Sequence, residues 1–359
     1  MPEELLELRN SAGAFERLEE WLSGHGFFGP DAEGLVADVY LGYGLSHSIR
    51  RDSTTPPPEP CPALPLAACR VREPNRSPVT DRHNDTRLGA WERTWTAAEY
   101  RSAIEEVRCA IARGDVYQVN VVQHLHASFA GDPGALAAQL APLRPLNSDP
   151  FVTDDWAVVS ASPELFLARR GDRLWTMPIK GTRPRGEAGE LRASEKDAAE
   201  HVMIVDLERN DLSRVCRAGT VRWPELMATR ELAGVEHMVS TVEGRLRSGV
   251  GLAGVLEATF PGGSVTGAPK IAAVDIIAEL EPVGRGSSMG AIGQIYGNGD
   301  FDLALTIRTF AIAEGTIHLW VGGGIVWDSD PATEVEESWT KARPLLEAIG
   351  SRLPEAAFA

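Results

Sequence analysis

The sequence has little of several features that define well-known protein classes. Its 359 residues include only four cysteines and no Cys-x-x-Cys pair, which argues against a disulfide scaffold. No apolar run approaches the roughly 18 residues that a membrane-spanning helix needs. The start, Met1-Pro2-Glu3-Glu4, is acidic where a signal peptide would be basic. We therefore expect a cytoplasmic protein with reduced thiols and no membrane association.

Basic residues are scarce relative to acidic ones. Lys and Arg number 35 against 51 Asp and Glu, a formal net charge of −16 at pH 7. Because no stretch concentrates Lys and Arg, we expect no nucleic-acid partner. Hydrophobic residues still make up 43% of the chain, which is typical of a globular protein with a sizeable core.

The hydrophobic pattern predicts strands in runs, with helices between the runs. Helices are predicted over Leu5–Leu22, Thr96–Gly114, Ser194–Val215, Ala268–Leu280 and Pro331–Ile349. Strands are predicted over Val116–Val122, Trp156–Ser160, Leu165–Arg169, Leu174–Ile179, around Val221, Met238–Leu246, Ala291–Tyr296, Leu303–Ala313 and Thr316–Val321. This order favours an α+β fold with largely antiparallel sheets over a doubly wound parallel sheet.

The clearest local signal is the helix start at Thr96. Thr96-Ala97-Ala98-Glu99 fits a capping box, in which the Thr hydroxyl and Glu carboxylate bond the first unpaired amides. The stretch before it, from Arg50 to about Arg87, is rich in proline, which forbids regular helix and central strand. We interpret that stretch as a mobile loop or linker.

Two glycine-rich segments could approach a ligand closely. Gly262 to Lys270 begins like a Walker A loop, but Ala268-Pro269 stands where that loop needs Lys-Ser/Thr, which argues against nucleotide binding. A glycine turn before a helix can instead hold a carboxylate. Gly322, Gly323 and Gly324 follow a predicted strand and resemble a ligand-contacting turn, although either segment alone is equally well a tight turn.

Carboxylates share faces on two predicted helices. Glu334, Glu337 and Lys341 lie three and four residues apart, and Asp197 and Glu200 lie three apart. Two converging carboxylate patches would suit a hard cation such as Mg²⁺. Glu337 and Lys341 could equally be an exposed ion pair.

Other candidate functional residues have weaker support from sequence spacing alone. Lys180 follows an apolar strand and, if partly buried, could act as a nucleophile, although a surface lysine is the simpler reading. His124 and His126 alternate on one strand face, which is more typical of a packed or exposed face than of a metal site.

Several blocks together resemble the chorismate-utilising enzymes, most closely the members that aminate chorismate at C4. They occur in the family's order and cover about Thr96 to Ile349. The blocks are Ser162–Phe166, Pro178–Thr182, Glu200–Leu207, Phe260–Lys270, Gly290–Gly293, Thr306–Thr309 and Gly322–Lys341. The resemblance implies two large antiparallel sheets packed with helices, with the active site between them. It divides the chain into a shortened N-terminal region, 1–95, and a catalytic domain, 96–359.

The resemblance implies a role for each matched residue. Lys180 would be the covalent nucleophile and Glu164 the general acid and base. Mg²⁺ would be bound by Glu200 and Glu337, with Asp197 and Glu334 in support. The implied substrate-binding residues are Gln118, Thr182, His237, Ser264, Arg308, Gly322, Gly323, Gly324 and Lys341.

Two positions narrow the implied reaction. Gln118 stands where water-using relatives have a lysine base, which points to an amine nucleophile. Lys180 stands where anthranilate synthases usually have alanine, which points to amination at C4 and to 4-amino-4-deoxychorismate, in the para-aminobenzoate and folate branch. The resemblance also implies a separate glutamine amidotransferase subunit as the source of ammonia.

Two alternatives remain open at this point. One is an anthranilate synthase component that makes ortho-aminobenzoate from chorismate. The other is a chorismate-binding protein without catalytic activity, because Gln294 replaces a tyrosine common in the family and the N-terminal region is short.

Overall fold

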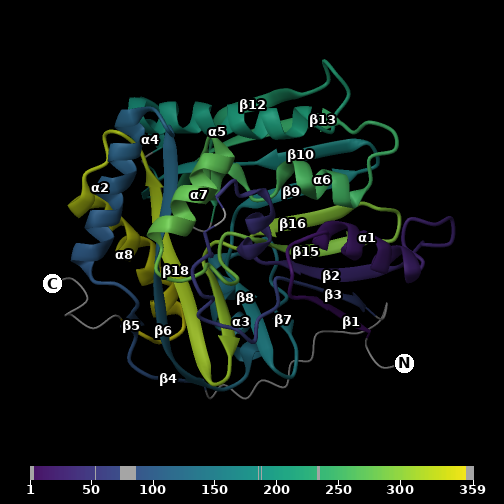
Figure 1. Ribbon diagram of the computed structural model, residues 1–359, viewed down its shortest axis with the longest axis horizontal. Helices are drawn as coiled ribbons and strands as arrows, with labels where there is room; N and C mark the ends of the chain where they lie inside the picture. The colour runs from purple at the N-terminus through teal and green to yellow at the C-terminus, as the bar shows by residue number, and fades with distance from the viewer. Residues whose placement is uncertain are drawn as a thin grey trace.

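Two large antiparallel sheets form the framework of the protein (Figure 1). The computed structural model describes residues 4–52, 54–72, 86–184, 186, 188–232 and 235–352. Strand pairing is antiparallel throughout this part of the chain, and helices pack against both sheets. The predicted α+β fold with two antiparallel sheets is therefore confirmed.

The first sheet has ten strands in the described residues, and it brings strands from residues 5–72 beside strands from residues 291–305. Its order is β1 (Leu5–Leu8), β3 (Ala67–Arg72), β2 (Val36–Leu41), β15 (Ala291–Tyr296), β16 (Phe301–Leu305), β9 (Leu165–Arg170), β10 (Arg173–Met177), β13 (Val235–Arg245) and β11 (Ile179–Pro184), and β12 (Arg222–Leu232) also pairs with β13.

The second sheet has eight strands in the described residues. Its order is β14 (Gly267–Ala268), β6 (Gln118–Ala130), β18 (Thr316–Ile325), β17 (Thr309–Ala313), β8 (Trp156–Ser160) and β7 (Phe151–Val152), with β4 (Arg87–Leu88) and β5 (Glu92–Arg93) paired to β6. The long pair β6–β18 runs down the left of Figure 1.

Helices cover the outer parts of both sheets. Helices α2 and α8 pack together beside β18 at the left of Figure 1, and α5 packs against β13 and β11. The helices are α1 (Ala14–Gly24), α2 (Ala97–Arg113), α3 (Pro133–Leu140), α4 (Ala188–Ala193), α5 (Glu195–Ser213), α6 (Leu252–Thr259), α7 (Lys270–Leu280) and α8 (Pro331–Ala348), with short 3₁₀ turns at Tyr43–Ile49, Ala141–Leu143 and Gly263–Val265.

One hydrophobic core joins the two sheets. It combines buried side chains of the first sheet, such as Leu167 and Leu303, with buried side chains of the second, such as Phe310 and Leu319. No helix in the described part of the chain is both long enough and apolar enough to span a bilayer.

The predicted capping box and the predicted helix end at Gly114 are confirmed, and Ser194 caps a second helix. Thr96 and Glu99 form both bonds of the capping box, and Gly114 ends α2 in the left-handed conformation at φ 81°. Ser194 caps α5 by accepting a hydrogen bond from the Asp197 amide. These signals are local, so the sequence alone is sufficient to place them.

The predicted helix over Leu5–Leu22 is wrong in its first half. Leu5–Leu8 form β1, which pairs with β3, and the helix begins only at Ala14. An Asn10 side chain that accepts from the Ala12 amide, and Gly13 at φ 62°, form the turn between them. Strand pairing with a distant segment overrides the local apolar spacing.

The proline-rich stretch is only partly the loop that we expected. Residues 73–85 lie outside the described residues. The prolines between residues 56 and 66 lie in no helix or strand, as predicted, but Ala67–Arg72 form β3 between β1 and β2. Glu59, inside this stretch, accepts a hydrogen bond from the Gly286 amide at 2.9 Å. The segment therefore packs on the body of the protein.

Two predicted strands are each split in two. Leu174–Ile179 divides at Pro178 into β10 and β11, because proline has no amide hydrogen for the ladder. Leu303–Ala313 divides into β16 and β17, which belong to different sheets. Arg308, at φ 50°, lies in the connection between them.

The glycines expected to form a turn after a strand are part of the strand. Gly322, Gly323 and Gly324 lie within β18 and pair with Val122, Val121 and Asn120 of β6. On the other edge, β17 pairs with β18 only as far as Leu319. The glycine segment is therefore bordered by a paired strand on one edge only in the described residues.

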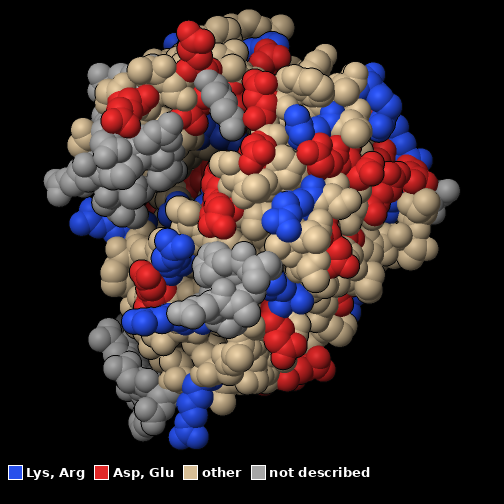
Figure 2. All heavy atoms as spheres, turned by 90° about the vertical axis from the view of Figure 1, so that its left-hand side faces the viewer, with Lys and Arg blue, Asp and Glu red and all other residues tan. Residues whose placement is uncertain are grey.

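Charges of both signs are mixed on the face that bears α2 and α8. Figure 2 shows Lys and Arg side chains interspersed with Asp and Glu there, and a hollow with acidic side chains at its rim. This distribution agrees with the absence of a concentrated basic stretch in the sequence.

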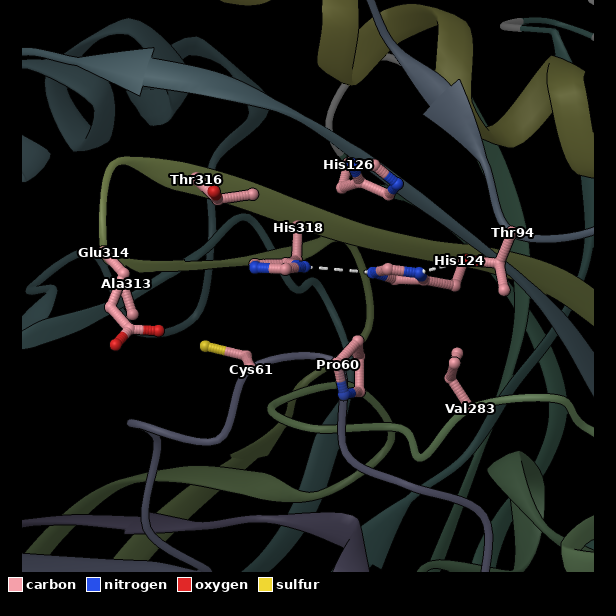
Figure 3. Close-up of a pocket in the computed structure, with 10 residues that line it drawn as sticks. All are labelled: Pro60, Cys61, Thr94, His124, His126, Val283, Ala313, Glu314, Thr316 and His318. Carbon is pink, nitrogen blue, oxygen red and sulfur yellow. Dashed lines mark hydrogen bonds between the residues drawn. The ribbon is translucent and has the colours of Figure 1, made fainter.

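A histidine-lined cavity of about 360 Å³ lies between β6, β18 and the loop at Pro60 and Cys61 (Figure 3). Thr94 Oγ1 lies 2.6 Å from His124 Nδ1, and His124 Nε2 lies 3.0 Å from His318 Nδ1. Burial lowers the pKa of His124 to about 3 and that of His318 to about 4, and neighbouring imidazoles add to the effect. The predicted packed strand face is confirmed for His124, which is 3% exposed.

Because His124 and His318 are buried and neutral, we expect stability to fall as the pH drops below about 6.5. Both folded-state pKa values lie below the ordinary value of 6.5, so the unfolded chain binds more protons in this range. Each histidine should then cost about 1 kcal/mol of unfolding free energy per pH unit. Urea unfolding across this range should give a shallower pH dependence for His318→Gln than for the wild type, and equal slopes would contradict the prediction.

Candidate active site

Two neighbouring segments cross from one sheet to the other and bring Glu164 and Arg308 together. Residues 161–164 connect β8 to β9, and residues 306–308 connect β16 to β17. Since β8 pairs with β17 and β9 with β16, the two connections run side by side. The Ala161 amide donates to the Arg308 carbonyl at 2.9 Å, and the Leu305 amide donates to the Glu164 carbonyl at 3.0 Å. These backbone bonds fix both side chains at the junction of the sheets.

Glu164 has the environment of a general acid. Its side chain is buried, with a residue exposure of 5%. Ser264 Oγ donates to Glu164 Oε1 at 2.7 Å, and the Ile179 amide lies 3.4 Å from the same oxygen. Burial raises the pKa of Glu164, and the hydrogen bond from Ser264 and the charge of Lys180 oppose the rise. A raised pKa lets a carboxyl group keep a transferable proton near neutral pH.

Lys180 lies on β11, close enough to Glu164 for the charges of the two side chains to interact. Burial lowers the pKa of Lys180, and the nearby carboxylates of Glu200, Glu164 and Glu337 oppose the lowering. The ammonium group of Lys341 acts in the same direction as burial. Lys180 therefore loses its proton more easily than an exposed lysine, as a nucleophilic amine requires.

Arg308 supplies a positive charge to the same region. Its backbone is in the left-handed conformation at φ 50°, where the chain turns between the sheets. Burial lowers the pKa of Arg308, and the Glu164 carboxylate opposes this. The guanidinium group stays charged at neutral pH and is available to a negatively charged ligand.

Helix α5 directs two of the predicted carboxylates towards β11. The Ser194 cap places Asp197 in its first turn. A Cβ atom on Gly181 would lie 3.4 Å from Asp197 Oδ1, so the absence of a side chain lets this carboxylate approach the strand. Glu200, one turn further on, is the largest charge acting on Lys180.

Helix α8 brings the other two carboxylates onto the glycines of β18. A Cβ atom on Gly323 would lie 3.2 Å from Lys341 Nζ, 3.3 Å from Glu334 Oε2 and 3.9 Å from Glu337 Oε1. Lys341 Nζ also donates to the Gly322 carbonyl at 3.0 Å. The glycine therefore lets three charged side chains of α8 lie against the strand.

The Glu337–Lys341 pair has the geometry of the simple ion pair that the spacing allowed. The two side chains are 2.8 Å apart and are 48% and 39% exposed. The same Glu337 carboxylate also acts on the pKa of Lys180. The pair thus borders the cluster around Lys180.

Gln118 begins β6 and is fully buried. Its side chain packs on Gly324, where a Cβ atom would lie 2.5 Å from Gln118 Nε2. Neither polar atom of the amide group has a hydrogen-bond partner among the described residues. Because a buried amide without partners is costly, a polar ligand or water at this point would stabilise the arrangement.

Thr182 of β11 and His237 of β13 are partners in the backbone register of the two strands. His237 Nδ1 lies 3.1 Å from the Gly181 carbonyl and donates to it, and burial lowers the pKa of the imidazole. The Thr182 side chain lies outside the described residues.

His201 was not among the site residues predicted from the sequence. It is buried on α5, with Nε2 lying 2.6 Å from Ser240 Oγ. Burial lowers its pKa to about 4, and the charge of Lys180 adds to this effect. The sequence signal that could have identified His201 is that it directly follows Glu200.

Most of the predicted residues therefore connect through contacts and charges around Glu164, Lys180 and Gly323. Their individual roles stay predictions. Among the described residues, no group of three or more His, Cys, Asp or Glu side chains is close enough to hold a single metal ion. The four predicted metal ligands instead form one pair on α5 and one on α8, with Lys180 under the influence of Glu200 and Glu337.

Comparison with known proteins places this geometry in a family. A family model described as chorismate binding enzyme matches residues 15–347. Among solved structures, anthranilate synthase component I from Streptococcus pneumoniae has a TM-score of 0.77 and 27% identity, over 86% of this chain and 80% of that one. The menaquinone-specific isochorismate synthase from Escherichia coli has a TM-score of 0.70 at 19% identity, over 97% of this chain and 86% of that one, which shows the fold alone.

The curated relatives divide between two activities. Aminodeoxychorismate synthase component 1 of Klebsiella aerogenes is 40% identical over 74% of this chain and 61% of its own length. Anthranilate synthase component 1 of Thermus thermophilus is 43% identical over 70% of this chain and 56% of its own length. The chain thus spans about three fifths of the length of these relatives.

We expect Ser264→Ala to raise the pKa of Glu164, because the lost hydrogen bond favours the ionised carboxylate. A hydrogen bond to a charged group contributes about 1.5–3 kcal/mol, so the rise should be about 1–2 pH units. Infrared titration of the protonated carboxyl band, assigned with Glu164→Gln, measures it. Ser329→Ala is the control, because it removes a buried hydroxyl elsewhere, one that accepts a hydrogen bond from the Val326 amide. An unchanged titration in Ser264→Ala would contradict the prediction.

Proposed function

Because the chain belongs to the chorismate binding enzyme family, we propose that it aminates chorismate with ammonia at C4 to give 4-amino-4-deoxychorismate and water. One observation carries the choice of product. Lys180, whose pKa burial lowers, lies within electrostatic reach of Glu164, whose pKa burial raises. A neutral amine beside a protonated acid suits covalent displacement of a poor leaving group.

In the first step, the unprotonated Lys180 Nζ attacks ring C2. The two ring double bonds shift, the C4–oxygen bond breaks, and the proton of Glu164 converts the departing hydroxyl to water. Nζ becomes a secondary ammonium group and Glu164 a carboxylate. The hydrogen bond from Ser264 stabilises that carboxylate as it forms.

In the second step, ammonia adds at C4 and the double bonds shift back. The C2–Nζ bond breaks, and Lys180 leaves as a neutral amine. The new C4 ammonium group returns a proton to Glu164, so both residues end in their starting forms. Dividing the displacement in this way replaces one difficult step with two easier ones.

Charged groups around the glycines of β18 would hold the substrate. Arg308, Lys341 and the backbone of Gly322 to Gly324 would bind the enolpyruvyl carboxylate. Ser264 and His237 would contact the ring side. These positive groups matter because the protein carries a net charge of −16 and the substrate is a dianion.

We propose Mg²⁺ as the cofactor that the carboxylates of α5 and α8 would share. Glu200 and Glu337 would hold it, with Asp197 and Glu334 in support, since hard oxygen ligands suit this ion. The approach of Glu334 and Glu337 to Gly323 leaves their oxygens against the strand that would bind substrate. When bound, Mg²⁺ would neutralise charge between these carboxylates and the substrate's ring carboxylate.

A separate glutamine amidotransferase would supply the ammonia. The names of several relatives as component 1 of a synthase support this partner. Free ammonium at high concentration should then replace it in the assays below.

The second candidate function is that of an anthranilate synthase component. Its support is the 43% identity to the Thermus thermophilus protein of that name. The two candidates differ in product, because one retains the enolpyruvyl group and aminates C4 and the other aminates C2 and releases pyruvate.

We expect Lys180→Ala to abolish formation of 4-amino-4-deoxychorismate while leaving the fold intact. Loss of the covalent route should lower the rate on the order of 10²-fold or more, and any remaining amination should occur at C2. Chromatography of reactions with chorismate, Mg²⁺ and ammonium separates the products. Lys180→Arg, which keeps a positive charge but cannot attack, should lose the same product.

Wild-type rates of C4 amination in Lys180→Ala would rule out the covalent mechanism. Recovery of activity in Lys180→Arg would show that only the charge at this position matters. Ortho-aminobenzoate and pyruvate from the wild-type protein would favour the second candidate function.

We expect Glu337→Gln to lower activity and weaken the apparent affinity for Mg²⁺, because it removes one charged oxygen ligand. Initial rates across a Mg²⁺ titration measure both effects. Glu336→Gln is the matched control, since Glu336 is an exposed neighbour on the same helix. Equal Mg²⁺ dependence in the two variants would show that the Glu337–Lys341 pair is only a surface ion pair.

A further inference from the structure

A buried carboxyl group lies directly behind Ser264. Glu208, on the last turns of α5, is 4% exposed, and its Oε1 accepts a hydrogen bond from the Gly263 amide at 3.0 Å. Gly263 precedes Ser264, whose hydroxyl donates to Glu164 at 2.7 Å. Glu208 thus connects to the proposed general acid through one short turn of backbone.

That turn, Gly263–Val265, is held at two points. Glu208 bonds the amide at its start, and Arg285 Nη1 donates to the Val265 carbonyl at its end, at 3.0 Å. Gly262, which precedes the turn, contributes no side-chain cap. Ser264 lies between the two anchors, so either anchor affects where its hydroxyl points.

The charges around Glu208 favour the neutral form of its carboxyl group. Two buried carboxyl groups, Glu208 and Asp211, lie near Lys270 of α7, and the charge of Arg214 also acts on Asp211. Lys270 Nζ donates to Asp211 Oδ2 at 2.5 Å and to the Thr259 carbonyl at 2.8 Å, so its charge is directed to Asp211. Burial raises the pKa of Glu208 to about 8, and the charges of Asp211 and Glu164 act in the same direction.

We propose that Glu208 is a positioning residue for the reaction, which holds the Gly263–Ser264 turn so that the Ser264 hydroxyl bonds Glu164. The inference rests on the proposed function only in that the reaction depends on Glu164. Glu208 does not touch the substrate, and its side chain acts as a hydrogen-bond acceptor rather than as a charge.

Two substitutions separate the acceptor from the charge. Glu208→Gln keeps an oxygen for the Gly263 amide and removes the ionisable group, so kcat should stay within about threefold of the wild type. Glu208→Ala removes the acceptor, and kcat should fall on the order of 10²-fold with little change in KM, since a displaced catalytic group slows chemistry more than binding. If kcat fell as much in Glu208→Gln as in Glu208→Ala, the acceptor role would be overturned.

A double-mutant cycle tests the connection to Ser264. If Glu208 acts through the Ser264 hydroxyl, Glu208→Ala in a Ser264→Ala background should lower kcat by less than about threefold more. If the fold-losses in kcat of the two single variants multiplied in the double variant, the proposal would be overturned. Glu208 would then support activity by a route that does not involve Ser264.

The control for general damage to the fold is Glu19→Ala. Glu19 is also a carboxyl group that accepts from backbone amides, those of Leu252 at 3.2 Å and Ala253 at 2.8 Å at the start of α6. Its loss should lower thermal stability but leave kcat nearly unchanged. A fall in kcat as large as that of Glu208→Ala would overturn the proposal.

A measurement on the protein without substrate tests the role of Glu208 separately from the proposed function. Glu208→Ala should change the infrared titration of Glu164 in the same direction as Ser264→Ala, whatever the protein makes from chorismate. An unchanged titration in Glu208→Ala would overturn the positioning role, while failure of C4 amination in the wild type would overturn only the proposed function.

Discussion

The site depends on burying one carboxyl group where the chain passes between two sheets. Glu164 lies in a connection that backbone hydrogen bonds tie to the neighbouring connection of Arg308. A buried carboxylate is costly unless it is hydrogen-bonded and near positive charge. Ser264 and Arg308 meet this need, and Lys180 adds to it while it is protonated. The rest of the site is arranged around these groups.

The protein has few lysines, and most of them lie near the site. The sequence has four lysines among its 35 Lys and Arg residues. Lys180 and Lys341 face the carboxylates of α5 and α8, and Lys270 bonds the buried Asp211 behind Ser264. Arginine serves most surface ion pairs, so the few flexible, titratable amines are concentrated where their protonation matters.

Local signals in the sequence predicted much of the fold, whereas the candidate site residues were named by the family resemblance. The capping box at Thr96 and the strand Trp156–Ser160 were placed correctly because they depend on neighbouring residues. The division of Leu303–Ala313 between two sheets could not be predicted, since apolar alternation does not say which strand is the partner. The proposed role of Glu208 could not be predicted either, because nothing in its spacing indicates that Gly263, far along the chain, is its neighbour.

The paired crossings also have a consequence for how the protein folds. The bond between Leu305 and Glu164 joins residues 141 positions apart, and the strands on either side are paired across similar separations. Such distant contacts form late and slowly, because long loops must close before any pairing stabilises them. A nascent chain that ends before residue 305 has Glu164 but none of the partners at the second crossing. Appearance of activity during refolding should therefore be among the last events to be completed.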